Sequence, residues 1–220
     1  MIEVTISHIN PELACNDFDL LLPLVSHEKQ DRIKRFHAFR DKRNCLLGDI
    51  LVQVEISRIT GLKNAQLHFA VNERGKPYLI DCPNIHFNIS HSGDYIACAI
   101  SEEPVGIDIE QIKSADIHIA HRFFAMDEVE YIQSDDANSR FYEVWTMKES
   151  RIKLEGLGLY KPLSSFSVFD STEQGFVYYH EVLKNKETIC YVCTTKKSTP
   201  TAKLMSTHQL MKYVKNELSF

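Results

Sequence analysis

The stretch VGIDIE at residues 105–110 decides how this chain is interpreted, because apolar and acidic residues alternate along it. Side chains of a β-strand point to opposite faces in turn, so a strand here turns its isoleucines towards a core and Asp108 and Glu110 towards the other face. Two carboxylates side by side are suitable oxygen ligands for Mg²⁺. A solvated edge strand shows the same alternation, so this pattern alone leaves both interpretations open.

A second segment, WTMKESRIK at residues 145–153, has the spacing of a helix. Trp145 lies one turn from Lys148 and Glu149, and Glu149 lies one turn from Lys153. With Asp108 and Glu110 this gives three carboxylates beside lysines, which suits a Mg²⁺ ion that holds a phosphorylated substrate. Taken alone, Glu149 and Lys153 also fit an ordinary surface ion pair.

Composition describes a globular protein with a real core, since 44% of the 220 residues are apolar. The formal charge of −5 gives no reason to expect nucleic acid as a partner. Positive charge is nevertheless concentrated between Lys29 and Arg43, where seven basic residues are interrupted only by Asp31 and Asp41. This cluster is either a solvated helix face or a source of cations for phosphate, to which Lys148 and Lys153 would add.

The chain shows no features of export or of a membrane span. The N-terminus lacks a basic segment followed by an apolar one, and no apolar run approaches 18 residues. We therefore expect a soluble, cytoplasmic protein that does not act at a membrane. The six cysteines show no disulfide framework, so reduced thiols are expected. The CYVC run at 190–193 falls in a predicted strand, where residues three apart face opposite sides, which argues against a metal or redox role.

Helices and strands are predicted to occur in the same order twice. In residues 1–104, helices at about 26–36 and 40–59 precede strands at 67–71, 78–80, 87–90 and 95–100. In residues 105–220, a strand at 105–109 precedes helices at 117–124, 127–133 and 140–155 and strands at 166–169, 176–180 and 189–195. We predict an α+β fold of two similar halves, each an antiparallel sheet with packed helices, related by a pseudo-twofold axis. A cleft between the halves is the expected ligand site.

A further polar segment, NISHSG at residues 88–93, lies at the end of a predicted strand. A Ser–His nucleophile is disfavoured here, because sequence neighbours do not form triad geometry and no G-x-S-x-G turn is present. Ser90 and His91 fit phosphate binding better, with Lys76 on the tight GKP turn as another cation. A structural His–Ser turn is the alternative.

Taken together, these segments resemble the 4′-phosphopantetheinyl transferases of the surfactin-synthetase type, in which one chain forms a pseudodimer. The resemblance extends along nearly the whole chain, and the joint order of G-I-D-x-E and W-x-x-K-E-x-x-x-K is specific to that family. Arg32 stands where relatives often have lysine, and residues 198–220 match no motif. The matching pieces are a basic helix, LLGD (46–49), GKP (75–77), FNISHSG (87–93), VGIDIE (105–110), RFF (122–124), WTMKESRIK (145–153) and GLGL (156–159).

The resemblance implies transfer of 4′-phosphopantetheine from coenzyme A to a serine of an apo carrier protein, with release of 3′,5′-ADP. Mg²⁺ would be held by Asp108, Glu110 and Glu149, with Glu149 also the candidate general base. Lys153 would neutralise or orient the pyrophosphate. The expected contacts of the 3′-phosphoadenosine part are Lys29, Arg32 and His91, with Lys76 and Ser90 nearby.

The resemblance also implies where the carrier would dock. The segment 122–124 and the residues after Lys153 are expected to face it, and Leu157, Leu159 and Tyr160 would receive an amphipathic helix unless they pack in the core. Two halves in one chain predict a functional monomer. The competing hypotheses are a Mg²⁺-dependent nucleotide phosphohydrolase and a non-catalytic module that binds coenzyme A.

Overall fold

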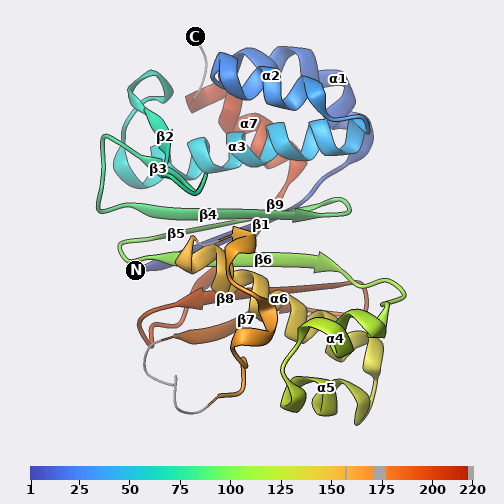
Figure 1. The fold of residues 1–220 in the computed structure, drawn as a ribbon. Coiled ribbons are helices and arrows are strands. Elements are labelled where there is room, and N and C mark those ends of the chain that lie inside the picture. Colours follow the sequence, from blue (N-terminus) through green and yellow to red (C-terminus); the bar gives the residue numbers. More distant parts are fainter. Residues whose placement is uncertain (157, 171–176, 218–220) are drawn as a thin grey trace.

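Two β-sheets, one in each half of the molecule, lie between helices in a computed structural model that describes residues 1–156, 158–170 and 177–217 (Figure 1). The first sheet has the strand order β4-β5-β1-β9 and the second has the order β6-β8-β7. The strands of the first sheet are β1 (Ile2–His8), β4 (His86–Ser92), β5 (Tyr95–Ser101) and β9 (Thr201–Ser206). Those of the second are β6 (Val105–Gln111), β7 (Tyr178–Lys184) and β8 (Thr188–Thr194).

The two sheets repeat one connectivity. In the first half, β1 leads through helices to α3 (Phe39–Thr60), β4 and β5, and β5 pairs antiparallel with both β1 and β4. In the second half, β6 leads to α6 (Ala137–Glu155), β7 and β8, and β8 pairs antiparallel with both β6 and β7. The predicted α+β fold of two similar halves with antiparallel sheets is therefore confirmed, and the repeat is consistent with a pseudodimer.

Local sequence explains the helices of the first half, which are α1 (Pro11–Leu21), α2 (His27–Arg35) and α3, with short 3₁₀ turns at Leu22–Leu24 and Asn64–Gln66. Ser26 caps α2 by accepting a hydrogen bond from the amide of Lys29, at the start of the helix predicted over 26–36. The α3 helix ends at Gly61, which adopts the left-handed conformation with φ of 73°. A small hairpin of β2 (Phe69–Val71) and β3 (Pro77–Leu79) follows.

The helices of the second half are α4 (Ile117–Phe123), α5 (Met126–Gln133) and α6, followed by 3₁₀ turns at Gly158–Tyr160 and Leu163–Ser165. The strand predicted at 166–169 is wrong, because this segment forms a loop and turn. Its apolar Phe166 is buried for another reason, since the ring lies under the ammonium of Lys148 at 4.1 Å. Of the strand predicted at 176–180, the start lies outside the described residues, and β7 begins at Tyr178.

The C-terminal segment crosses the division that was expected at residue 104. Strand β9 pairs parallel with β1 in the first sheet, and α7 (Thr207–Glu217) lies beside α3 (Figure 1). Leu210, Met211 and Val214 of α7 pack into the core that contains α3. Residues 201–217 therefore complete the N-terminal half. This parallel pair also departs from the purely antiparallel sheet that was expected.

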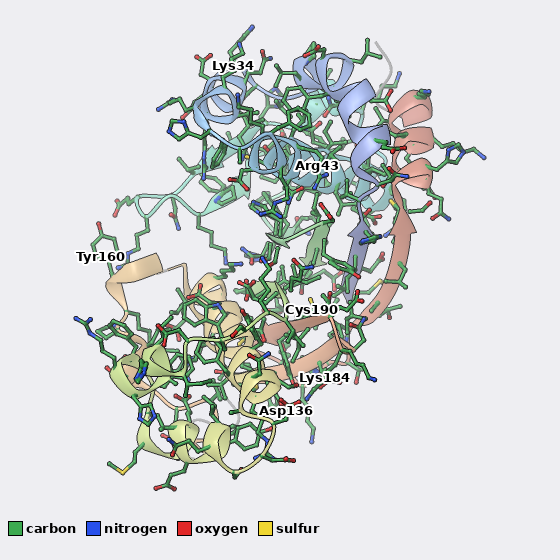
Figure 2. The ribbon with its side chains drawn as sticks, turned by 90° about the vertical axis from the view of Figure 1, so that its right-hand side faces the viewer. Lys34, Arg43, Asp136, Tyr160, Lys184 and Cys190 are labelled. Atoms are coloured by element: carbon green, nitrogen blue, oxygen red, sulfur yellow. The ribbon has the colours of Figure 1, made fainter. Side chains whose placement is uncertain are left out.

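A shared core joins the two halves. Small and β-branched side chains of β1 and β5 contact those of β6 and β8, and Cys190 lies at this junction (Figure 2). The opposite face of the first sheet packs on α3, whereas that of the second sheet packs on α6. The buried members of the shared core are Ile2, Val4, Ile6, Ala97, Ala99, Val105, Ile107, Ile109, Cys190 and Val192.

Gly106 is required where β6 passes under α6. A Cβ atom at this position would lie 2.0 Å from the carbonyl oxygen of Ser150 and 2.4 Å from the amide nitrogen of Leu154. Because both atoms belong to a helix backbone, neither can move aside without displacing α6. We expect Gly106→Ala to lower the free energy of unfolding by about 3 kcal/mol, as measured by urea denaturation.

A matched control is Gly48→Ala on α3. There the nearest atom to an added Cβ is the terminal carbon of the Ile89 side chain, which can rotate away. We expect a change within about 1 kcal/mol, because alanine also favours the helix. Equal losses in the two variants would show that the approach of β6 to α6 is not the cause.

Candidate active site

Strand β6 presents Asp108 and Glu110 on the face that α6 covers. The alternate residues Val105, Ile107 and Ile109 are fully buried in the core shared by the halves, so the acidic pair must face the other way. The side chain of Asp108 is almost completely buried and that of Glu110 is half-buried. The strand and the shared face of these two carboxylates are as the sequence predicted.

Lys153 of α6 meets Asp108 across the interface of strand and helix. Its Nζ lies 2.6 Å from Asp108 Oδ1 and 2.8 Å from the Ser90 hydroxyl. The Ser90 hydroxyl in turn donates to the same Asp108 oxygen at 2.8 Å. Ser90 of β4 and Lys153 of α6 therefore converge on one oxygen atom of Asp108 on β6. The buried Oδ2 of Asp108 accepts no hydrogen bond from the part of the chain that the structure describes.

The carboxyl of Glu110 lies beside this group. The Ser92 hydroxyl donates to its Oε2 at 2.6 Å. Burial and the charge of Asp108 raise the pKa of Glu110 to about 7, against the opposing effects of Ser92, Lys153 and the Trp145 side chain.

Glu149 is the third carboxylate near this group. Burial and the negative charge of Asp108 raise its pKa, while Lys153 one turn away lowers it. Asp108 thus disfavours the ionised forms of both neighbouring glutamates. A divalent cation would relieve this repulsion, and the unpartnered Asp108 Oδ2 is a suitable oxygen ligand, so these residues fit Mg²⁺. In the described ranges, no three His, Cys, Asp or Glu side chains are close enough together to coordinate a metal ion. The cation that contacts Asp108 in this structure is the Lys153 ammonium.

Charged residues of the first half interact with α3 and with the carboxylates of the second half. Lys29 forms an ion pair of 2.9 Å with Asp49 of α3, and the charge of Arg32 also acts on Asp49. Partial desolvation and Lys153 lower the pKa of His91, while Asp41 and Asp108 oppose this change. Charges of α3 and of the carboxylate site therefore both act on His91.

Lys148, which the sequence offered as a further cation for phosphate, is engaged by other partners in this structure. Its ammonium is completely buried, lies 2.8 Å from Glu128 of α5, and donates to the carbonyls of Leu163 and Phe166 at 2.7 Å each. Lys148 and Lys153 are five residues apart, which rotates them by about 140° around the helix. Lys148 therefore connects α6 to α5 and to the segment that follows α6, on a different side of α6 from Lys153.

Lys76 lies at the end of α6 rather than free in solution. Its ammonium donates to the carbonyls of Lys153, Leu154 and Val105 at 2.6, 2.9 and 3.3 Å. Burial lowers the pKa of Lys76 to about 8. The residue thus connects the hairpin of the first half to the second half, and its expected contact with coenzyme A stays a prediction.

The expected carrier-docking residues differ in exposure. Phe123 and Tyr160 are exposed, and Tyr160 projects outward (Figure 2), which excludes core packing for it. Phe124 is buried and stacks on Phe141. Leu157 and the side chain of Leu159 lie outside the described part of the structure.

The sequence analysis did not identify the β4 residues that hydrogen-bond to β6. The run Asn88, Ser90 and Ser92 repeats every second residue, and all three point from β4 towards β6. Asn88 Oδ1 accepts from the amide of Ile107 at 2.9 Å, Ser90 binds Asp108, and Ser92 binds Glu110. The period-two polar pattern was a signal that could have been used for Ser92.

The raised pKa of Glu110 predicts how the stability of the metal-free protein depends on pH. The folded chain holds a proton on Glu110 up to about pH 7, whereas an unperturbed glutamate loses it near 4.5. The folded state therefore binds more protons between these values, and this contribution destabilises it as the pH rises through the window. We expect Glu110→Gln to raise the free energy of unfolding by about 1–2 kcal/mol at pH 8 and by nothing at pH 4.5, in urea titrations with EDTA.

The exposed Glu187 supplies the control for that measurement. For Glu187→Gln, the difference from the parent in free energy of unfolding should not grow between pH 4.5 and 8. A Glu110→Gln variant that is less stable than the parent at pH 8 would contradict the repulsion described above.

Comparison with known proteins agrees with this geometry. Residues 11–103 match the family model "4′-phosphopantetheinyl transferase, N-terminal", and residues 104–209 match "4′-phosphopantetheinyl transferase superfamily". The chain belongs to the 4′-phosphopantetheinyl transferase superfamily.

Among individual proteins, the chain is similar to several bacterial 4′-phosphopantetheinyl transferases. It is 42% identical over 164 residues to a 4′-phosphopantetheinyl transferase of Bacillus subtilis and 41% identical to the transferase Sfp of strain 168, with 73% of each chain covered. It is 40% identical over 181 residues to the transferase gsp of Aneurinibacillus migulanus, covering 81% of this chain and 76% of that protein. Among the described residues no helix is long and apolar enough to cross a bilayer.

Proposed function

We propose that the chain transfers the 4′-phosphopantetheine group of coenzyme A to a serine of an apo acyl or peptidyl carrier protein and releases 3′,5′-ADP. The observation that carries this proposal is the convergence of Ser90, Asp108 and Lys153 beside Glu110 and Glu149, at the junction of the two halves. Family membership supports coenzyme A as the substrate.

Asp108, Glu110 and Glu149 would hold Mg²⁺. When bound, the ion would stabilise the charge that develops on the transferring phosphoryl group. Lys153 adds positive charge next to Asp108, where a pyrophosphate would bring further negative charge. The coenzyme's 3′-phosphoadenosine part would contact Lys29, Arg32 and His91, with Lys76 and Ser90 nearby.

The reaction needs a base for the carrier hydroxyl. The serine oxygen forms a bond to the β-phosphorus, the bond from that phosphorus to the oxygen of 3′,5′-ADP breaks, and the serine proton leaves. Glu149 is our candidate to accept it, because burial and Asp108 raise its pKa and so make it a stronger base.

The carrier would dock on the second half, where Phe123 and Tyr160 are exposed. A cation–π contact of 5.1 Å between Arg122 and the Phe123 ring holds this side chain at the surface. We further propose that one chain suffices for activity, because both halves of the site are present in it. Free thiols at five described cysteines agree with a cytoplasmic location.

Intact mass spectrometry tests this proposal. The protein is incubated with coenzyme A, Mg²⁺ and a panel of apo carrier proteins, and each carrier is weighed. We expect a phosphopantetheine adduct on at least one carrier, lost when EDTA is added and when the acceptor serine is alanine. Cleavage of coenzyme A without an adduct would indicate a phosphohydrolase, and binding without either product would indicate a non-catalytic module.

A further inference from the structure

The two sheets meet along β4 and β6 through side chains instead of a backbone ladder. Both strands lie at the edge of their sheets, and alternate residues of β4 bridge the gap. These residues lie on the same face of the sheet as Ala97 and Ala99 of β5, which belong to the core shared by the halves. The first half therefore supplies the hydroxyls that contact the carboxylates of the second.

Ser92 has a fixed direction of hydrogen bonding. Its oxygen accepts from the amide of Gln111 at 3.0 Å, and its only proton is donated to Glu110 Oε2 at 2.6 Å. A hydroxyl that is held by a backbone amide cannot turn freely, so the carboxylate that it contacts is held as well. Glu110 is thereby tied to both strands.

Trp145 of α6 is a second neighbour of this carboxyl. Its indole N–H is a group that can donate to Glu110. The ring packs 6.2 Å from that of Phe124 and 5.9 Å from that of Phe141, measured between ring centroids, which restricts its rotation. Since indole nitrogen is a donor only, this contact favours the ionised carboxylate.

We propose that Ser92 and Trp145 are positioning residues that orient Glu110 towards Asp108 as a ligand of the divalent ion. This inference rests on the proposed function. Groups that hydrogen-bond to a metal ligand fix its orientation and raise its affinity for the ion, and their loss costs about 10–100-fold in binding. Neither residue is expected to touch the metal or the substrate.

Metal binding is the direct test, with Mn²⁺ as the probe and free Mn²⁺ counted by electron paramagnetic resonance. We expect Ser92→Ala and Trp145→Phe to raise the dissociation constant about 10-fold, since Phe keeps the ring packing and removes only the donor. Ser92→Thr retains the hydroxyl and should bind nearly as the parent does. Thermal melting of each variant shows that it is folded.

A second readout uses the chain's single tryptophan. Titration with Mg²⁺ should change Trp145 emission in the parent, and the midpoint should shift to higher Mg²⁺ in Ser92→Ala. Transfer by Ser92→Ala should recover as Mg²⁺ is raised, whereas a merely structural defect would not respond to the metal.

Ser167→Ala is a matched control, because that hydroxyl also donates to a carboxylate, Asp127, at 2.6 Å, far along the chain from β4 and β6. Its Mn²⁺ affinity should equal that of the parent. Parent-like Mn²⁺ affinity in both Ser92→Ala and Trp145→Phe would overturn this inference and leave the proposed function standing. A parent protein that neither binds Mn²⁺ nor modifies a carrier would overturn both.

Discussion

Replacing Asp108 with asparagine is expected to lower the rate of phosphopantetheine transfer by about 10³-fold or more while the protein stays folded. Asparagine keeps an oxygen that can accept from Ser90 but removes the charge that pairs with Lys153 and that would bind the metal. Glu149→Gln should have an effect of similar size. The rate is measured in single turnover with a saturating apo carrier, following the holo product by mass.

The control for Asp108→Asn is Asp19→Asn, an exposed change on α1. It should leave the rate unchanged, and circular dichroism should show the same helical content in all variants. If Asp108→Asn retained a tenth of the parent rate, Asp108 would not be a metal ligand. Transfer that persists in excess EDTA would remove the metal from the proposed mechanism altogether.

Replacing Lys148 with methionine is expected to lower the free energy of unfolding by about 3–5 kcal/mol. The carboxylate of Glu128 is fully buried and accepts from the amides of Ala125 and Val168 at 2.8 Å each. The variant removes the ammonium that pairs with this carboxylate and so leaves the carboxylate without its ion-pair partner in the core. Urea unfolding at pH 7.5 measures the loss.

The double variant Lys148→Met with Glu128→Gln separates charge from packing. Glutamine removes the unpaired charge, so the double variant should be more stable than Lys148→Met by about 1–2 kcal/mol, a coupling that independent sites do not show. Coenzyme A affinity of folded Lys148→Met should equal that of the parent. A large loss of coenzyme A affinity would show that Lys148 contributes to coenzyme binding and would contradict a purely structural role.

Local patterns in the sequence were sufficient to predict most elements. The alternation at 105–110 gave the strand β6, and Ser26 and Gly61 marked the start of α2 and the end of α3, because caps act within one helical turn. The apolar run at 166–169 led to a wrong strand prediction. Phe166 is buried because it contacts the Lys148 ammonium, not because it belongs to a strand. A cation buried fifteen or more residues away leaves no local signal.

Pairing between distant segments was beyond the sequence. Strand β9 follows β1 by nearly the whole length of the chain, and the energy of that parallel pair depends on backbone groups that every residue carries. Nothing in residues 198–220 therefore identifies β1 as the partner. Likewise, Glu128 reads as one of several acidic residues on a short helix until α5 is placed against α6.

The sequence by itself determined that Asp108 and Glu110 share a face of a strand, and that Glu149 and Lys153 share a face of a helix, because both follow from fixed backbone periods. Only the tertiary structure decided which face of α6 meets β6. Lys153 reaches Asp108 on that face, whereas Lys148, about 140° away around the helix, is buried against Glu128. Two lysines of one motif thus differ in role, since burial and partners are set by the packing of elements distant in the chain.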